Sequence, residues 1–148
     1  MRARMIFGVV VVGLVGIGCG KSNPIDRALT QAQVAEDVIC ECPEAVGVTT
    51  DAECRARVQA NAWTPTEEEC LRRVYAAHAE ELRPVFDCQY EASVDFTNCV
   101  RSALATCPPT MAAATACNDA LDAAFAACPR PSTTTEAELS ACFPATTT

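Results

Sequence analysis

Cysteine is the residue type that most constrains how this chain can fold. The 148-residue sequence contains eleven cysteines, and an odd number leaves at least one outside any intramolecular disulfide. Setting aside Cys19, near the N-terminus, leaves ten, the even number that a closed set of disulfides requires. We therefore expect five disulfides. The ten cysteines are Cys40, Cys42, Cys54, Cys70, Cys88, Cys99, Cys107, Cys117, Cys128 and Cys142.

The remaining composition indicates a core that needs such cross-links. The length allows one domain, and 27 of the 148 residues are alanine while only 5% are aromatic. An alanine-rich core buries little apolar area per residue, so the disulfides compensate for missing core. These values exclude a large enzyme, a collagen-like chain and a membrane protein with many spans.

The first residues have the pattern of an export signal. Arg2 and Arg4 precede an uncharged stretch of twelve residues, 6–17, which is too short to span a bilayer core that needs about 20. The stretch leads into Ile17 and the small residue Gly18, directly before Cys19. Here the chain resembles a bacterial lipoprotein precursor. The resemblance implies a diacylglycerol on the Cys19 thiol and cleavage before it.

We expect the chain to have four parts. The resemblance, which covers only the first twenty residues, implies a cleaved signal peptide (1–18) and a lipidated N-terminus, followed by a short linker (19–23). The helix and cysteine pattern of the remaining residues indicates a cysteine-rich helical domain (24–143) and a C-terminal tail (144–148). The alternative is an ordinary signal peptide, with Cys19 incidental or paired. Either signal exports the chain to an oxidising compartment, where disulfides persist.

The expected location is the bacterial cell envelope. Gly20 and Lys21 follow Cys19, and neither is the Asp that keeps lipoproteins of enteric bacteria at the inner membrane, so the outer membrane is favoured over the inner. Loss of the signal peptide leaves nine basic and nineteen acidic residues, a net charge of −10. This charge excludes nucleic acid and anionic lipid headgroups as partners. The partners expected are the membrane, through the lipid, and a protein that the sequence does not identify.

The sequence of the mature chain predicts an all-α fold, because it has no alternation of apolar and polar residues of the kind typical of strands. We expect four to five helices, over residues 25–42, 51–61, 65–105 and 110–128, with a last short one after Thr135. Pro84 is expected to kink or restart the third helix, and Pro108-Pro109 to end it.

Capping residues support these helix boundaries. They are Ser22 or Asn23 before Pro24, Thr50 or Asp51 for the second helix, Thr64 with Pro65 and Glu67 for the third, and Thr135 with Glu138 for the last.

Cysteine spacing predicts which helices are cross-linked. Taking Pro108 as the tip of an antiparallel hairpin, Cys99 and Cys117 each lie nine residues away, and Cys88 and Cys128 each lie twenty away. Residues equidistant from the turn face each other, so we predict disulfides Cys99–Cys117 and Cys88–Cys128. Bridged helices must approach closely, which small residues permit. The alanines expected to do so are Ala112, Ala113, Ala116, Ala120, Ala124 and Ala127.

The same rule, applied to the loop at Ala62, predicts Cys54–Cys70. Cys40 and Cys42 are too close to bridge each other without strain. Each is therefore expected to pair with Cys107 or Cys142, and the sequence does not decide which.

Two sequence features invite a chemical interpretation. His78 is the only histidine and is expected at a surface helical position, with no serine in a nucleophile context. Cys40-Glu41-Cys42 has the spacing of a thiol-exchange or soft-metal pair. Nearby acids raise thiol pKa values, which favours structural disulfides. We expect no enzymatic activity, no metal and no cofactor; the alternative function is thiol-disulfide or metal handling through Cys40 and Cys42.

The large apolar residues are interpreted as core, with one open case. Trp63 lies at a helix connection, either as an exposed contact residue or as a cover over the end of a hairpin. The expected core residues are Ile25, Leu29, Val34, Val38, Val58, Leu71, Val74, Tyr75, Leu82, Phe86, Tyr90, Val94, Phe96, Leu104, Leu121 and Phe125.

Overall fold

The computed structural model describes residues 23–60 and 62–143, and every regular element in these stretches is a helix. The all-α prediction is confirmed. The signal peptide, Cys19, most of the linker and the tail 144–148 lie outside the described residues. In chain order the elements are α1 (Pro24–Cys40), the 3-10 helix η1 (Pro43–Val46), α2 (Asp51–Gln59), α3 (Pro65–Ala77), α4 (Ala79–Ala103), α5 (Met111–Ala127) and α6 (Thr133–Ala141).

The first three α-helices begin at the predicted caps. The Asn23 side chain accepts a hydrogen bond from the backbone N–H of Ile25, at 3.0 Å, and Pro24 takes the first position of α1. Thr50 and Thr64 both form capping boxes, each with the glutamate three residues on. These side chains satisfy backbone donors that the first helical turn leaves unpaired.

The last helix begins differently from the prediction. Ser132, not Thr135, caps α6, and its hydroxyl accepts from the Thr135 N–H. Thr135 is instead buried, because its own hydroxyl donates to a carboxylate of α4. Glu138 therefore completes no capping box and faces His78.

The predicted 65–105 helix is divided at His78, which accounts for six α-helices in the described residues in place of four to five. His78 leaves the helical conformation, with φ −126° and ψ 33°. Pro84 lies inside α4, so of the two alternatives predicted for it, a kink or a restart of the helix, the restart is wrong. A proline ring clashes with the carbonyl four residues before it, and the break lies on that N-terminal side.

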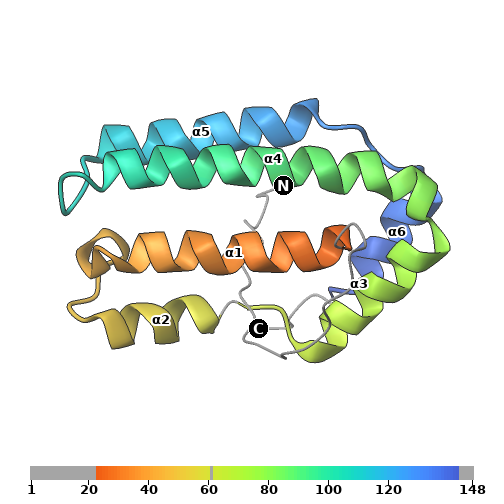
Figure 1. The fold of residues 1–148 in the computed structure, drawn as a ribbon, viewed down its shortest axis with the longest axis horizontal. Helices are drawn as coiled ribbons and strands as arrows, with labels where there is room; N and C mark the ends of the chain where they lie inside the picture. Colours follow the sequence, from red (N-terminus) through yellow and green to blue (C-terminus); the bar gives the residue numbers. More distant parts are fainter. Residues whose placement is uncertain (1–22, 61, 144–148) are drawn as a thin grey trace.

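The helices are stacked in the order α5, α4, α1, α2, with α3 and α6 together at one end (Figure 1). α4 and α5 form the predicted antiparallel hairpin, whereas α1 runs in the same direction as α4. The 3-10 helix after α1 and the α4–α5 turn consequently lie at the same end of the stack. Gly47, in the left-handed conformation with φ 76°, ends η1 and lets the chain return along α2.

The apolar core consists of two separate clusters. One lies where α1, α3, α4 and α6 meet, and the other joins α4 to α5. α1 and α4 also share a buried polar contact, in which the Gln31 amide donates to the Thr97 hydroxyl at 2.9 Å. The first cluster contains Ile25, Leu29, Leu71, Val74, Tyr75, Leu82, Phe86 and Cys142. The second contains Ala92, Phe96, Cys117 and Leu121.

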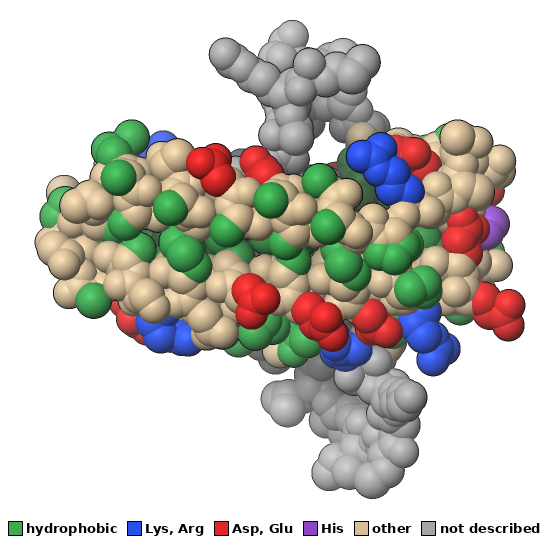
Figure 2. All heavy atoms as spheres, turned by 90° about the horizontal axis from the view of Figure 1, so that it is seen from above, with side chains coloured by type: hydrophobic (Ala, Val, Ile, Leu, Met, Phe, Trp, Pro, Cys, Tyr) green, Lys and Arg blue, Asp and Glu red, His purple; other side chains and the backbone are tan. Residues whose placement is uncertain are grey.

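α5 packs on α4 through one stripe, and the rest of its surface is exposed. Figure 2 looks onto this side of the molecule and shows hydrophobic side chains along its length, flanked by acidic and basic ones. Of the six alanines expected at the hairpin contact, only Ala113 and Ala124 are half-buried. Phe125 and Val34, expected in the core, are 40% and 38% exposed, because both lie beside the buried stripe of their helix. Within the described chain, no helix combines the length and apolar character needed to cross a membrane.

Candidate functional site

The ten cysteines after Cys19 are all joined in disulfides, with Cα–Cα distances of 5.5–5.8 Å. Cys19 itself lies outside the described residues. Both predicted bridges of the α4–α5 hairpin are confirmed. The five pairs are Cys40–Cys54, Cys42–Cys107, Cys70–Cys142, Cys88–Cys128 and Cys99–Cys117.

The predicted Cys54–Cys70 bridge is wrong, and so is the pairing of Cys40 with Cys107 or Cys142. Cys54 bonds to Cys40, and Cys70 bonds to Cys142. The equidistance rule needs two helices that pack against each other across their loop. Here α2 packs on α1 and α3 packs on α6, so the loop at Ala62 joins helices with different neighbours.

The Cys40-Glu41-Cys42 segment is divided between two disulfides. Cys40 points into the α1–α2 contact, while Cys42 crosses to Cys107 in the α4–α5 turn. The open choice for Cys42 is therefore resolved in favour of Cys107. The two cysteines do not act as one CxC pair in the oxidised protein.

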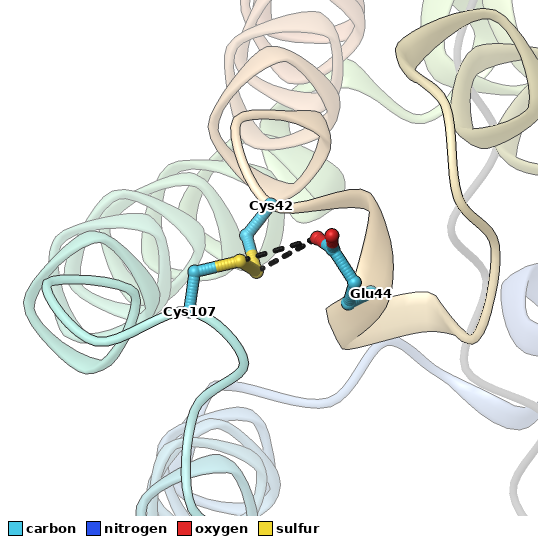
Figure 3. A group of neighbouring side chains, drawn as sticks. All are labelled: Cys42, Glu44 and Cys107. Carbon is cyan, nitrogen blue, oxygen red and sulfur yellow. Dashed lines mark hydrogen bonds between the residues drawn. A yellow bond between two sulfur atoms is a disulfide. The ribbon is translucent and has the colours of Figure 1, made fainter.

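An acidic side chain lies against this second disulfide (Figure 3). Glu44, in η1, places its Oε2 atom 3.8 Å from the Cys42 sulfur and 3.3 Å from the Cys107 sulfur. Cys42 is buried, with 1% of its surface exposed, whereas Glu44 and Cys107 are exposed. In the described chain this is the one group of three potential metal ligands drawn from His, Cys, Asp and Glu.

The oxidised form of this group has no metal-binding chemistry. A disulfide sulfur is neither a thiolate ligand nor a proton donor, so the dashed contacts in Figure 3 become donor–acceptor contacts only when the thiols form. In the sequence, Glu44 is only one of four acids near the CxC segment, with Glu36, Asp37 and Glu41. Its contact with Cys107 arises from a pairing 65 residues apart, which no local signal reveals.

His78 is not the plain surface position that the sequence predicts. It sits at the α3–α4 break, 28% exposed, with Nε2 3.0 Å from a Glu138 oxygen and Nδ1 3.5 Å from the Thr135 hydroxyl. Hydroxyl, imidazole and carboxylate are thus aligned as in a nucleophilic triad. However, only 1% of Thr135 is exposed and its hydroxyl donates to Glu81 at 2.8 Å, so it is closed to a substrate.

The His78 group instead attaches α6 to α4. The Glu81 carboxylate accepts hydrogen bonds from the Ser132 N–H and the Thr135 hydroxyl, and these bonds lower its pKa. These two hydrogen bonds hold the negatively charged Glu81 carboxylate at the N-terminus of α6, where the helix dipole favours a negative charge.

Trp63 contributes to structure more than to an exposed contact surface. It is half-buried against the first core cluster, and its ring lies 5.7 Å from that of Phe143. Of the two alternatives, the covering role is the nearer one, but Trp63 covers the first core cluster and not the end of a hairpin, because α2 and α3 pack on other helices.

No family model matches this chain, and comparisons with curated proteins and with solved structures gave no significant match.

Proposed function

We propose that this protein is an exported, lipid-anchored component of a bacterial cell envelope with a structural or protein-binding role. The observation that supports it is the cysteine count after pairing. Five disulfides use all ten cysteines of the helical domain, and only Cys19 is left for another purpose. An odd cysteine at the end of a signal-like segment fits lipidation, and disulfides fit an oxidising compartment.

The anchor would hold the domain close to the membrane surface. Only four residues separate Cys19 from Pro24, where α1 begins. At about 3.5 Å per residue, this segment reaches no more than roughly 18 Å. A mature chain of net charge −10 held at this distance repels anionic headgroups, so the lipid, not the protein surface, would provide membrane affinity.

A structural or binding role fits how the reactive groups are used. The described cysteines are all oxidised, and the sole histidine of the sequence is engaged by Glu138 and Thr135. We therefore propose no catalytic step. The alternative, thiol-disulfide or metal handling through Cys40 and Cys42 as a pair, is less well supported because each belongs to a different bridge.

The test is the intact mass of protein extracted from membranes with detergent, combined with thiol alkylation before and after reduction. We expect a chain that starts at Cys19 and carries acyl groups, with ten cysteines labelled only after reduction. The Cys19→Ser variant should keep its five disulfides but leave the membrane fraction. An unlipidated wild-type chain in the soluble fraction would overturn the anchor, and two thiols reactive without reduction would favour the alternative.

A further inference from the structure

The Cys42–Cys107 disulfide differs from the other four in its surroundings. Cys107 is exposed, whereas each other bridge joins residues that are buried or half-buried. Glu44 contacts both of its sulfurs. At Cys70–Cys142 the neighbouring charge has the opposite sign, since the Arg73 guanidinium lies 3.5 Å from the Cys70 sulfur.

We propose that reduction of Cys42–Cys107 creates a binding site for a thiophilic divalent cation of the Zn²⁺ class, with the two cysteine thiolates and the Glu44 carboxylate as ligands. The oxidised protein has no such site, so the disulfide controls whether the metal binds. This goes beyond the structural role proposed above and does not depend on the lipid anchor.

The reduction is a two-electron exchange with a dithiol. A thiolate of the dithiol attacks the sulfur of the exposed Cys107, the S–S bond breaks, and Cys42 leaves as a thiolate that takes a proton. The second thiol of the dithiol then displaces Cys107. The dithiol ends as a disulfide and the protein as two thiols, and Zn²⁺ binding releases the two thiol protons.

The carboxylate is already at the distance that a tetrahedral site needs. With Zn–S near 2.3 Å and Zn–O near 2.1 Å, the oxygen–sulfur edges of a tetrahedron are about 3.6 Å. The two Glu44 oxygen–sulfur distances, 3.3 and 3.8 Å, lie on either side of that value. The sulfurs must separate from bonding distance to about 3.8 Å, and Cys107, in the exposed turn between α4 and α5, provides that movement.

The ligand set also favours the metal electrostatically. Two thiolates and a carboxylate supply three negative charges to a divalent cation, and thiolates are ligands that Zn²⁺ prefers. Three protein ligands leave one position of the tetrahedron for water or an exogenous ligand. Cys42 and Glu44 are fixed in one short segment, because η1 starts between them at Pro43.

The experiment uses the full-length Cys19→Ser chain, so that no eleventh thiol contributes. The protein is reduced with one equivalent of a water-soluble phosphine. The phosphine becomes the phosphine oxide, and water supplies the oxygen and the protons. Alkylation and peptide mapping then identify the opened bridge. We expect Cys42 and Cys107 to be labelled first. Added Zn²⁺ should bind at one ion per chain by native mass spectrometry, and Cd²⁺ should give the ultraviolet charge-transfer band of cadmium thiolate.

Matched variants separate the ligand from general effects. Glu44→Gln should weaken Zn²⁺ binding at least about tenfold, the smaller of the losses seen even for outer-shell partners. Glu41→Gln, which changes an exposed acid next to Cys42, should leave the Zn²⁺ affinity unchanged. The Cys42→Ser/Cys107→Ser double variant should stay helical by circular dichroism and bind no metal. First reduction at another bridge, no binding by the reduced protein, or equal affinity of Glu44→Gln and the parent would each overturn the proposal.

Discussion

Glu36 in α1 is a carboxylate held where water does not reach it. Only 1% of its surface is exposed, Gln33 donates to its Oε2 atom at 3.2 Å, and Oε1 has no hydrogen-bond partner among the described residues. Burial raises the pKa of Glu36 above its ordinary 4.5, with the charge of Arg55 acting in the opposite direction. The folded chain therefore binds a proton at Glu36 more tightly than the unfolded chain does. The free energy of unfolding falls as the pH rises from below 4.5 through the raised pKa.

Replacing this carboxylate should stabilise the protein. We expect Glu36→Met to raise the free energy of unfolding at pH 7 by about 1 kcal/mol, since it removes a buried acceptor without a partner and keeps an unbranched side chain. The gain should shrink as the pH falls through the raised pKa of Glu36 towards 4.5, because below 4.5 the acid is protonated in both states. Denaturant unfolding across this pH range measures it, with exposed Glu41→Met as the control. If the Glu36→Met protein is less stable than the parent at neutral pH, interactions of the Glu36 carboxylate outweigh the cost of burying its charge.

At the scale of single elements, a buried hydroxyl and a disulfide are two of the contacts that attach α6. Thr135 donates to Glu81 at 2.8 Å, while Cys142 bonds to Cys70 of α3. Thr133 and Thr134 precede Thr135 in the same first turn but are exposed. This threonine run therefore offers matched substitutions that differ in burial alone.

Thr135→Val should lower the free energy of unfolding by about 1–2 kcal/mol, because the shape is kept while the carboxylate loses a donor. Thr134→Val should change it by less than about 0.5 kcal/mol, as for most surface positions. The pKa of Glu81 should rise towards its ordinary value in the Thr135→Val protein, which an NMR titration of its side chain would detect. Equal effects of the two valines would exclude the hydroxyl as the attachment.

The α4–α5 hairpin supports a prediction about its inner disulfide. Cys99→Ala and Cys117→Ala should each lower the free energy of unfolding by about 3 kcal/mol, because the bridge closes a loop of 18 residues. The double variant should lower the free energy of unfolding little more than either single variant, because each of the three removes the same disulfide. Chemical denaturation of the three variants tests this, and additive losses would contradict the pairing.

What the sequence predicts well in these elements is local or symmetric. Caps at Asn23, Thr50 and Thr64 depend on neighbouring residues, and the hairpin bridges follow from equal distances to one turn. The errors arise where tertiary neighbours decide. Cys54 and Cys70 flank one loop but belong to helices that pack elsewhere. Glu44 reaches the Cys107 sulfur for a similar reason, so the candidate site could not be found from spacing.

At the scale of the whole molecule, cross-links join parts that the core does not. The two apolar clusters are separate, and the second lies between α4 and α5 only. Cys40–Cys54 holds α2 to α1, and Cys42–Cys107 joins the end of α1 to the hairpin turn. Each disulfide typically contributes about 2–4 kcal/mol, and the total stability of a domain is about 5–15 kcal/mol. Five such bonds are therefore comparable with the entire stability of the fold.

Complete reduction should for this reason unfold the domain without denaturant. We expect excess reductant to abolish the cooperative thermal transition seen by circular dichroism, with partial helicity remaining in α1, α4 and α5, since these are the long helices. Alkylating the reduced chain prevents disulfides from re-forming, so the thermal unfolding of the oxidised and reduced chains can be compared at equilibrium. Removal of Cys42–Cys107 alone should leave the transition in place, because α1 still packs on α4 through the first cluster and Gln31. A reduced, alkylated chain that melts cooperatively near the oxidised temperature would show that apolar packing alone stabilises this fold.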